Sequence, residues 1–223
     1  MTALRTAKQK GDFEGLFNLY VEKTQSKLIK DCFHYMRSKH DSSPNPTRIE
    51  GTPYWVHPAE VWSYLVDLEL AAAHPMQLAA LLHDIDEDTD GNLEEIENLF
   101  GDEAAHIVCD LSHSTIPNYD SLDREWRREW YWNRIRGSMY ETKIVKGLDR
   151  HNNLVSLSAL LAQDPKRFKK FAYRQVSETE KYLLPILKGN GLIQNRVFYL
   201  LLGTCNTLNT MLDSIDPSLG DKA

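Results

Sequence analysis

The stretch Met76-Gln-Leu-Ala-Ala-Leu-Leu-His-Asp-Ile-Asp-Glu-Asp88 passes from apolar to acidic residues within a few helical turns. Its apolar part predicts a buried helix with His83-Asp84 in its last turn. A charged group in a protein core is costly unless it is paired or bound to a metal. Adjacent helical residues point roughly 100° apart. Both side chains can therefore reach one ion only if that ion lies in the groove beside them. The stretch therefore indicates a metal site. The alternative is a buried histidine whose ring nitrogens are hydrogen-bonded within the core.

Apolar residues recur at helical spacing over most of the chain on either side of this stretch. Phe13 to Tyr35 carries one such pattern, and the turn-forming residues Asp41-Ser-Ser-Pro-Asn-Pro-Thr47 predict a loop after it. Further helices are expected over residues 59–68, 76–85, 93–100, 103–111, 123–135, 138–161, 165–187 and 192–213. Long period-2 patterns typical of strands are absent from the sequence. The fold class predicted is an all-α bundle of roughly eight to ten helices.

The length of 223 residues suits a single domain. Hydrophobic residues make up 42% of the chain and aromatic residues 10%, which excludes a wholly disordered protein. We expect one domain over residues 1–215 and a frayed C-terminal tail over residues 216–223. The longest apolar run, residues 197–202, is far shorter than the roughly 20 residues that cross a bilayer, and no signal peptide is visible. No membrane association is therefore predicted.

The three cysteines Cys32, Cys109 and Cys205 are widely spaced and odd in number. Free thiols of this kind are typical of a reducing compartment, so we expect a cytoplasmic protein.

The net charge of −6 argues against general nucleic-acid binding, which usually needs a basic surplus. The charge is unevenly spread along the chain. Residues 81–103 hold ten acidic side chains and no Lys or Arg, whereas residues 124–150 hold eight basic against four acidic side chains. This distribution suits a site that binds a cation together with an anionic substrate. Two differently charged, solvated helix faces are the alternative.

Two further segments supply residues of the kind that bind metals. His57 lies in Pro53-Tyr-Trp-Val-His-Pro58, where a loop is expected to enter a helix, and Asp149 lies in an apolar-flanked helical segment. A mixed set of imidazole and carboxylate donors suits Mn²⁺, Fe²⁺ or Zn²⁺ and leaves room for water and a substrate oxygen. The candidate ligands are His57, His83, Asp84 and Asp149. Taken singly, His57 is also compatible with a helix cap, and Asp149 with an ion pair to Lys146 or Arg150.

Three motifs, taken together, resemble one known family. They are Arg48-Ile-Glu-Gly-Thr-Pro-Tyr-Trp-Val-His-Pro58, Ala79-Ala-Leu-Leu-His-Asp-Ile-Asp-Glu-Asp-Thr89 and Lys146-Gly-Leu-Asp-Arg-His-Asn-Asn153. Phe100-Gly101 and Glu178-Thr179 with Pro185 follow the same pattern. The order is similar to that of the HD superfamily of metal-dependent phosphohydrolases. In detail it resembles the hydrolase domain of RelA/SpoT-type alarmone enzymes and the stand-alone small alarmone hydrolases, over roughly residues 13–187.

The resemblance implies an all-helical HD hydrolase domain that binds one Mn²⁺ through His57, His83, Asp84 and Asp149. It implies that Glu87 and Asp88 order and activate water, and that Arg48 and Asn153 lie against the nucleotide. The implied reaction removes the 3′-pyrophosphate of ppGpp or pppGpp, the alarmones of the stringent response, and leaves GDP or GTP. Zn²⁺ and Fe²⁺ are alternative native ions, because the relative affinities of the metals for the site and their availability in the cell, rather than the sequence, decide which ion is bound.

The chemistry expected from the residues agrees with this reaction. A divalent ion lowers the pKa of water and withdraws charge from a phosphoryl oxygen. One nearby carboxylate accepts a proton and another donates one if a like charge raises its pKa, but the sequence does not assign these roles between Glu87 and Asp88. The phosphates need cations, for which Arg48, Lys146 and Arg150 are the candidates, with Lys143 beside them. Structural ion pairs are the alternative for the lysines and Arg150.

Ile49-Glu50 stands where the family usually has Lys-Ser, and His151 stands where it has Leu. The first departure leaves the metal chemistry intact but puts purine and phosphate recognition in doubt. Other 3′-phosphorylated substrates therefore stay open, namely ppApp or pppApp, NADPH and pyrophosphorylated RNA ends. A non-catalytic nucleotide-binding or partner-binding module is a third hypothesis.

Two segments have more than one interpretation. Trp126 and Trp130 share a helical face that suits either core packing or a base-stacking or partner surface. Residues 192–213 suit either a closing helix of the bundle or a dimer face, so a homo-oligomer is left open.

Overall fold

The computed structural model describes residues 7–8, 10–24, 26–68, 74–116, 121–189 and 191–215. The expected tail over residues 216–223 lies outside this part of the chain. The described residues are helical, apart from loops and one isolated bridge between Thr47 and Pro53, which confirms the all-α prediction. The chain divides into two compact units, Met1–Tyr119 and Asp120–Ala223, each of which is described by itself. The single domain over residues 1–215 stays a prediction.

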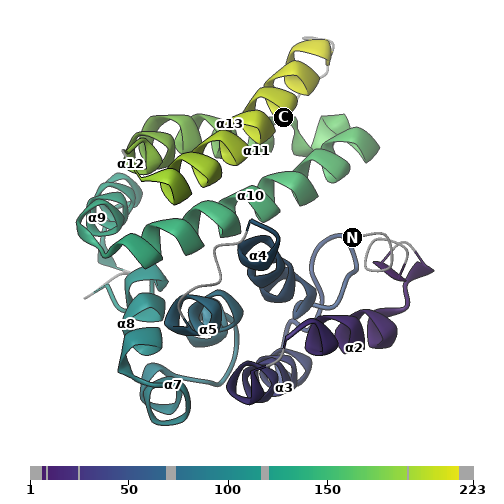
Figure 1. Cartoon of the computed structure of the whole chain (residues 1–223). Helices are drawn as coiled ribbons and strands as arrows, with labels where there is room; N and C mark the ends of the chain where they lie inside the picture. Colours follow the sequence, from purple (N-terminus) through teal and green to yellow (C-terminus); the bar gives the residue numbers. More distant parts are fainter. Residues whose placement is uncertain are drawn as a thin grey trace. The chain divides into compact units, whose positions relative to one another are not determined.

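Unit 1 is built around the apolar helix that directly precedes His83-Asp84. Its helices are α2 (Phe13–Lys23), α3 (Lys27–Ser42), α4 (Val56–Asp67), α5 (His74–Leu82), α6 (Ile85–Asp88), α7 (Leu93–Phe100) and α8 (Asp102–Leu111). Helix α5 packs against α3, α4 and α8 (Figure 1). Leu81 and Leu82 are fully buried, as are the large side chains of Phe33 and Trp62. This packing makes α5 the central helix of the unit.

Two helix boundaries in unit 1 differ from the sequence expectation. The apolar pattern from Phe13 to Tyr35 spans two helices, α2 and α3. The second begins after Ser26, whose side chain caps α3 by accepting a hydrogen bond from the Ile29 N–H. The helix expected over residues 76–85 ends at Leu82, and a turn at His83-Asp84 leads into the short helix α6. The turn takes the polar dipeptide out of the helix, so its two side chains are not constrained to helical directions.

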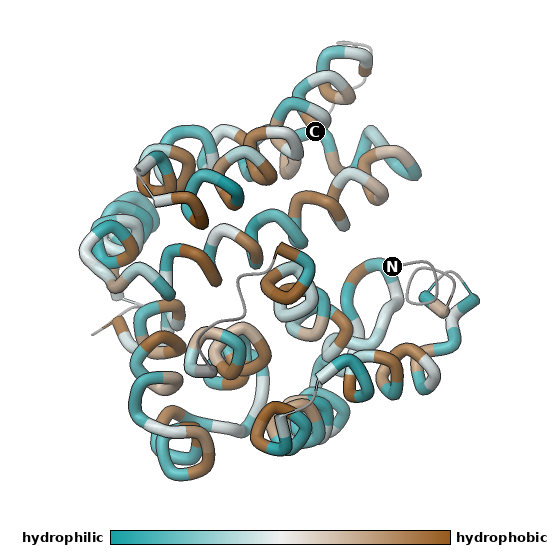
Figure 2. The backbone as a smooth tube through the Cα atoms, in the orientation of Figure 1, coloured by the Kyte–Doolittle hydropathy of each residue, from teal (hydrophilic) through white to brown (hydrophobic). Residues whose placement is uncertain are grey.

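Unit 2 consists of α9 (Arg124–Gly137), α10 (Tyr140–Gln163), α11 (Pro165–Glu178), a π-helical turn η2 (Thr179–Leu183), α12 (Leu184–Leu187) and α13 (Leu192–Ser214). Helix α10 packs against both α11 and α13. The inward face of α13 is apolar, as the hydropathy colouring illustrates (Figure 2). Its buried residues are Val197, Leu201, Cys205, Leu208 and Leu212. The closing-helix interpretation therefore holds within unit 2, and a dimer face stays a prediction.

The helix expected over residues 165–187 contains a π-helical turn at Thr179–Leu183. The Leu184 N–H donates to the Thr179 carbonyl, one residue further back than in an α-helix, and Pro185 next to it has no N–H. The Thr179 hydroxyl donates to the Gln175 carbonyl at 2.7 Å. The Glu178-Thr179 and Pro185 motif thus coincides with a local change in helix geometry.

The aromatic segment of α9 is divided between the core and the surface. Tyr131 and Trp132 are buried, whereas Trp126 is 46% exposed and stacks on Trp130 with ring centroids 6.4 Å apart. The prediction of core packing is therefore wrong for Trp126.

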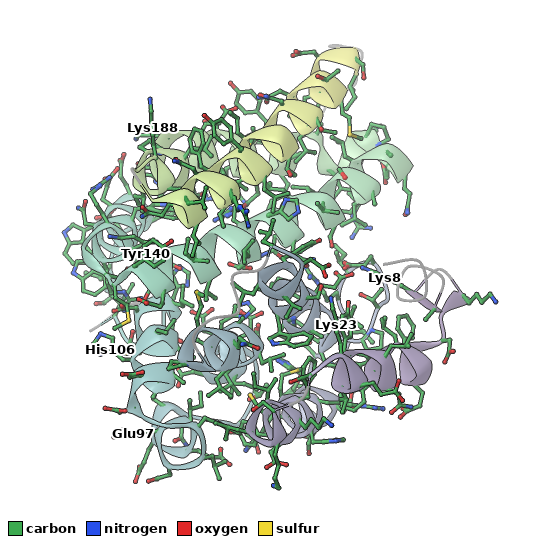
Figure 3. All side chains as sticks on the ribbon, in the orientation of Figure 1. Lys8, Lys23, Glu97, His106, Tyr140 and Lys188 are labelled. Carbon is green, nitrogen blue, oxygen red and sulfur yellow. The ribbon has the colours of Figure 1, made fainter. Side chains whose placement is uncertain are left out.

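Polar side chains of unit 1 point outward, as the labelled side chains of Glu97 and His106 illustrate (Figure 3).

Gly147→Ala is expected to destabilise unit 2 by about 1–3 kcal/mol, because overpacking displaces neighbouring side chains. A Cβ at this position would lie 2.5 Å from Val197 Cγ1 and 3.0 Å from Leu187 Cδ1. Gly137, at the end of α9, is the matched control, since its Cβ would meet no atom within 4 Å. Urea unfolding measures both variants. A Gly147→Ala protein as stable as Gly137→Ala would contradict the close packing of α10 against α13.

Candidate metal centre

His83 is oriented by the helix that precedes it. Its Nδ1 lies 3.0 Å from the carbonyl oxygen of Ala80, and because a carbonyl only accepts, Nδ1 must carry the hydrogen. The Nε2 atom therefore keeps its lone pair. A backbone hydrogen bond of this kind fixes the ring in the way that metal-binding histidines are usually fixed.

His57 and Asp84 meet His83 at this lone pair. Helix α4 carries His57, whose Nε2 lies 3.2 Å from His83 Nε2. Asp84 Oδ1 lies 3.1 Å from His83 Nε2, and Asp84 Oδ2 lies 3.4 Å from His57 Nε2. Both histidines are buried, with 2% and 4% of their surface exposed. Buried donor atoms that converge at these distances fit a divalent cation, which takes imidazole nitrogens at about 2.0–2.1 Å.

Tyr54 connects this cluster to one of the two expected catalytic carboxylates. Its hydroxyl lies 3.3 Å from Asp84 Oδ2 and donates a hydrogen bond to Asp88 Oδ2. Burial raises the pKa of the Asp88 carboxyl, and the neighbouring charges of Asp84 and Glu87 raise it further, against the opposing effect of the Tyr54 hydrogen bond. Burial raises the pKa of Tyr54, and the charges of Asp84 and Asp88 raise it further, so its hydroxyl stays protonated.

His40 covers the other side of Tyr54. The two rings are stacked, with centroids 4.8 Å apart and planes 15° apart. His40 is 1% exposed, and neither of its ring nitrogens has a hydrogen-bond partner. Burial lowers the pKa of His40 to about 4, an effect that Asp84 opposes and His83 and His57 reinforce, so the ring is neutral near pH 7. Neither His40 nor Tyr54 was predicted from the sequence as a site residue.

Glu87 points to a different neighbour from Asp88. It accepts hydrogen bonds from the backbone N–H and the Nδ1 of His113, in the segment after α8, and the Nδ1 contact measures 2.9 Å. The adjacent Asp86 accepts a hydrogen bond from the Ser114 hydroxyl. Of the two carboxylates expected to act on water, Asp88 is thus joined to the histidine cluster through Tyr54, and Glu87 to the loop at His113.

Arg48 lies in a tight turn before α4. Its N–H donates to the Thr52 carbonyl at 2.9 Å, and Gly51 takes a φ of +82°, a conformation that glycine adopts without strain. Arg48 Nε lies 3.3 Å from Glu50 Oε1, whereas Ile49 is 63% exposed. Glu50, one of the residues that depart from the family motif, therefore forms an ion pair with the arginine expected to contact the nucleotide.

In unit 2, Asp149 is held on the buried face of α10. It accepts hydrogen bonds from Lys146 Nζ at 2.9 Å and from Asn153 Nδ2 at 2.6 Å. Burial lowers the pKa of Lys146, but the attraction of Asp149 and Tyr131 outweighs it, so the pKa is raised overall and Lys146 stays charged. The ion pair considered as an alternative thus exists. The role of Asp149 as a metal ligand stays a prediction.

Arg150 contacts residues within unit 2. Its guanidinium donates to the Gln175 side chain, lies 3.9 Å from Glu178 Oε1, and lies 5.7 Å from the centre of the Trp132 ring. Glu178 also accepts a hydrogen bond from Trp132 Nε1 at 3.0 Å. These contacts give Arg150 and Glu178 a structural role, and substrate binding by Arg150 stays a prediction.

No described helix is both long enough and apolar enough to cross a membrane.

Comparisons with known proteins identify the family of this chain. The family model described as the HD domain matches residues 33–174, which is more than half of the chain. The bifunctional (p)ppGpp synthase/hydrolase SpoT of Escherichia coli (strain K12) is 28% identical over 147 residues, covering 65% of this chain and 20% of SpoT. The MESH1 guanosine-3′,5′-bis(diphosphate) 3′-pyrophosphohydrolase of Drosophila melanogaster is 29% identical over 132 residues, covering 59% of this chain and 70% of MESH1.

A protein of Aquifex aeolicus that bears the same enzyme name is 34% identical over 172 residues, covering 76% of this chain and 23% of that protein. The solved structure of a metazoan ortholog of SpoT that hydrolyzes ppGpp superposes with a TM-score of 0.60 at 22% identity. That superposition covers 81% of this chain and 96% of the other, and it concerns the fold alone. The chain spans about a fifth of the length of the first curated relatives it matches, because it covers 20% of SpoT. The chain belongs to the HD domain family and is homologous to the ppGpp hydrolases SpoT and MESH1.

Proposed function

We propose that the protein is a metal-dependent phosphohydrolase that removes the 3′-pyrophosphate of ppGpp or pppGpp and leaves GDP or GTP. The observation that carries this proposal is the convergence of His57 Nε2, His83 Nε2 and Asp84 on one point, with Asp88 joined to them through Tyr54. Homology to ppGpp hydrolases supports the class of reaction.

His57, His83 and Asp84 would hold the ion, and we propose that Asp149 completes the set. Mn²⁺ is the ion proposed, with Zn²⁺ and Fe²⁺ as the alternatives that metal analysis distinguishes. When bound, a divalent ion supplies a Lewis acid for a phosphoryl oxygen and lowers the pKa of water. The His83 ring needs no rearrangement for this role, because its Nδ1–H is already held by the Ala80 carbonyl.

The reaction cleaves the bond between the ribose 3′ oxygen and phosphorus, and consumes one water molecule. The water oxygen adds to phosphorus, the water loses a proton, and the leaving 3′ oxygen gains one. Asp88 suits proton transfer because burial and the neighbouring charge of Asp84 raise its pKa above that of an ordinary aspartate. We propose that Glu87 is the second carboxylate. Its contact with His113 fixes its position.

The substrate phosphates need positive charge and hydrogen-bond donors. We propose that Arg48, Lys146, Arg150 and Asn153 provide them. Lys146 is charged and Asn153 donates to Asp149, so in unit 2 both flank the proposed metal ligand. The physiological partner proposed is thus a small nucleotide, with no general nucleic-acid binding. A cytoplasmic location follows as a proposal from the free thiols Cys32, Cys109 and Cys205.

A second candidate is hydrolysis of a different 3′-phosphorylated compound. The observation that favours it is the ion pair between Arg48 and Glu50, because an acid beside this arginine lowers the positive charge available to a phosphate. The compounds concerned are ppApp, pppApp, NADPH and pyrophosphorylated RNA ends. This candidate retains the same metal centre and the same carboxylates.

One experiment tests both candidates. The purified full chain is loaded with Mn²⁺ and incubated with each compound of this panel, and the products are identified. We expect pyrophosphate together with GDP or GTP from ppGpp or pppGpp, and little turnover of the others. Preferential turnover of another compound would favour the second candidate. A metal-loaded protein that hydrolyses none of them would contradict both and leave a binding module.

A further inference from the structure

We propose that Tyr54, backed by the ring of His40, is a positioning residue that links the metal ligand Asp84 to the catalytic carboxylate Asp88. This inference rests on the proposed function, since it assigns a role within the same site. It adds two residues that the motif comparison left without a role.

The backbone of Tyr54 is fixed on both sides. Its N–H donates to the Pro46 carbonyl at 2.8 Å, and its carbonyl accepts from the His57 N–H at 3.0 Å. Tyr54 therefore joins the loop before α4 to the first turn of that helix, where His57 lies. A side chain anchored in this way moves together with the histidine that would bind the ion.

The hydroxyl of Tyr54 lies between two carboxylates. A tyrosine hydroxyl has one hydrogen to donate, and here it goes to Asp88 Oδ2, while Asp84 Oδ2 lies 3.3 Å away. Two carboxylates that face each other repel, and a donor between them relieves part of that repulsion. Removal of the hydroxyl should therefore free both carboxylates to turn away from each other.

His40 restrains the Tyr54 ring from the opposite face. The stack at 4.8 Å is the contact that can hold the phenol in place, because neither nitrogen of His40 has a hydrogen-bond partner. Buried polar atoms without a partner destabilise a fold. The face of the ring, rather than its nitrogens, is thus what the site uses. A phenyl ring should serve equally well at this position.

The test compares four variants of the full chain in kcat, KM, Mn²⁺ affinity and thermal stability. Tyr54→Phe removes the hydroxyl, His40→Ala removes the stack, and His40→Phe keeps the stack without the nitrogens. Tyr20→Phe is the matched control, since Tyr20 is a buried tyrosine in α2 whose ring packs against Phe33 and Trp62.

We expect Tyr54→Phe to lower kcat about 10–100-fold at saturating Mn²⁺ and to weaken Mn²⁺ binding about tenfold, as loss of a residue that orients a metal ligand does. KM should stay within about threefold, because the hydroxyl is assigned no contact with substrate. His40→Ala should reproduce these losses, whereas His40→Phe and Tyr20→Phe should match the parent protein.

An unchanged kcat and Mn²⁺ affinity in Tyr54→Phe would overturn the inference. Equal losses in His40→Phe and His40→Ala would overturn the role of the stack and assign one to the nitrogens. If the parent protein binds Mn²⁺ but hydrolyses no compound of the panel, the proposed function fails. Mn²⁺ affinity, measured by electron paramagnetic resonance of the free ion, then decides the inference by the same comparison of variants.

Discussion

His83→Ala is expected to abolish stoichiometric binding of the divalent ion and to lower hydrolysis of ppGpp by about 10³-fold or more. An ion that withdraws charge from a phosphoryl oxygen contributes several kcal/mol to the transition state, and each 1.36 kcal/mol is tenfold in rate. His83 Nε2 lies within 3.2 Å of both His57 Nε2 and Asp84 Oδ1, so its removal opens the cluster at its centre. The change also removes the hydrogen bond to the Ala80 carbonyl, worth roughly 1 kcal/mol, and leaves a cavity where the buried ring was, which adds to the cost in stability.

Metal content by mass spectrometry, product release and circular dichroism measure this outcome together. His106→Ala is the matched control, because this histidine is exposed on α8 and the exposed fraction of its side chain is 64%. The control should keep its metal, activity and helix content. Parental activity in the His83→Ala protein would show that hydrolysis takes place without this centre.

Asp88→Asn is expected to lower kcat by about 10²–10⁴-fold while the protein still binds its metal, since a positioned acid or base contributes about this much to a proton transfer. The asparagine side chain has nearly the same shape and its amide oxygen still accepts from the Tyr54 hydroxyl. What it loses is the ability to take up or release a proton. Single-turnover kinetics at saturating Mn²⁺ measure the loss in the chemical step.

Asp90→Asn is the control for this change, because the exposed fraction of the Asp90 side chain is 80% and it pairs only with Lys39 among the described contacts. It should leave kcat unchanged. Glu87→Gln supplies the comparison within the motif. A full loss in Glu87→Gln combined with parental activity in Asp88→Asn would contradict the role assigned to Asp88.

The features predicted from sequence are those set by local pattern. The helix Leu93–Phe100 agrees with the range predicted, because its apolar period is encoded by neighbouring residues. The HD domain fold and the homology to ppGpp hydrolases agree as well. The His57, His83 and Asp84 side chains of unit 1 lie close together, and their role as metal ligands stays a prediction.

The features that were missed depend on contacts between distant residues. The turn at His83-Asp84 has no breaker such as glycine or proline, so periodicity extends the helix past it. The stack of His40 on Tyr54 joins residues on either side of a proline-containing loop, and nothing in either residue type predicts it. The exposure of Trp126 is similar, since a helical spacing shared with Trp130 does not tell which side of the helix is covered.

X-ray diffraction from crystals grown with Mn²⁺, with anomalous data collected at the manganese edge, tests the proposed centre most directly. We predict one anomalous peak at bonding distance, about 2.0–2.2 Å, from His57 Nε2, His83 Nε2 and carboxylate oxygens of Asp84 and Asp149. A peak at other residues, or none in crystals of protein that is active with Mn²⁺, would contradict it.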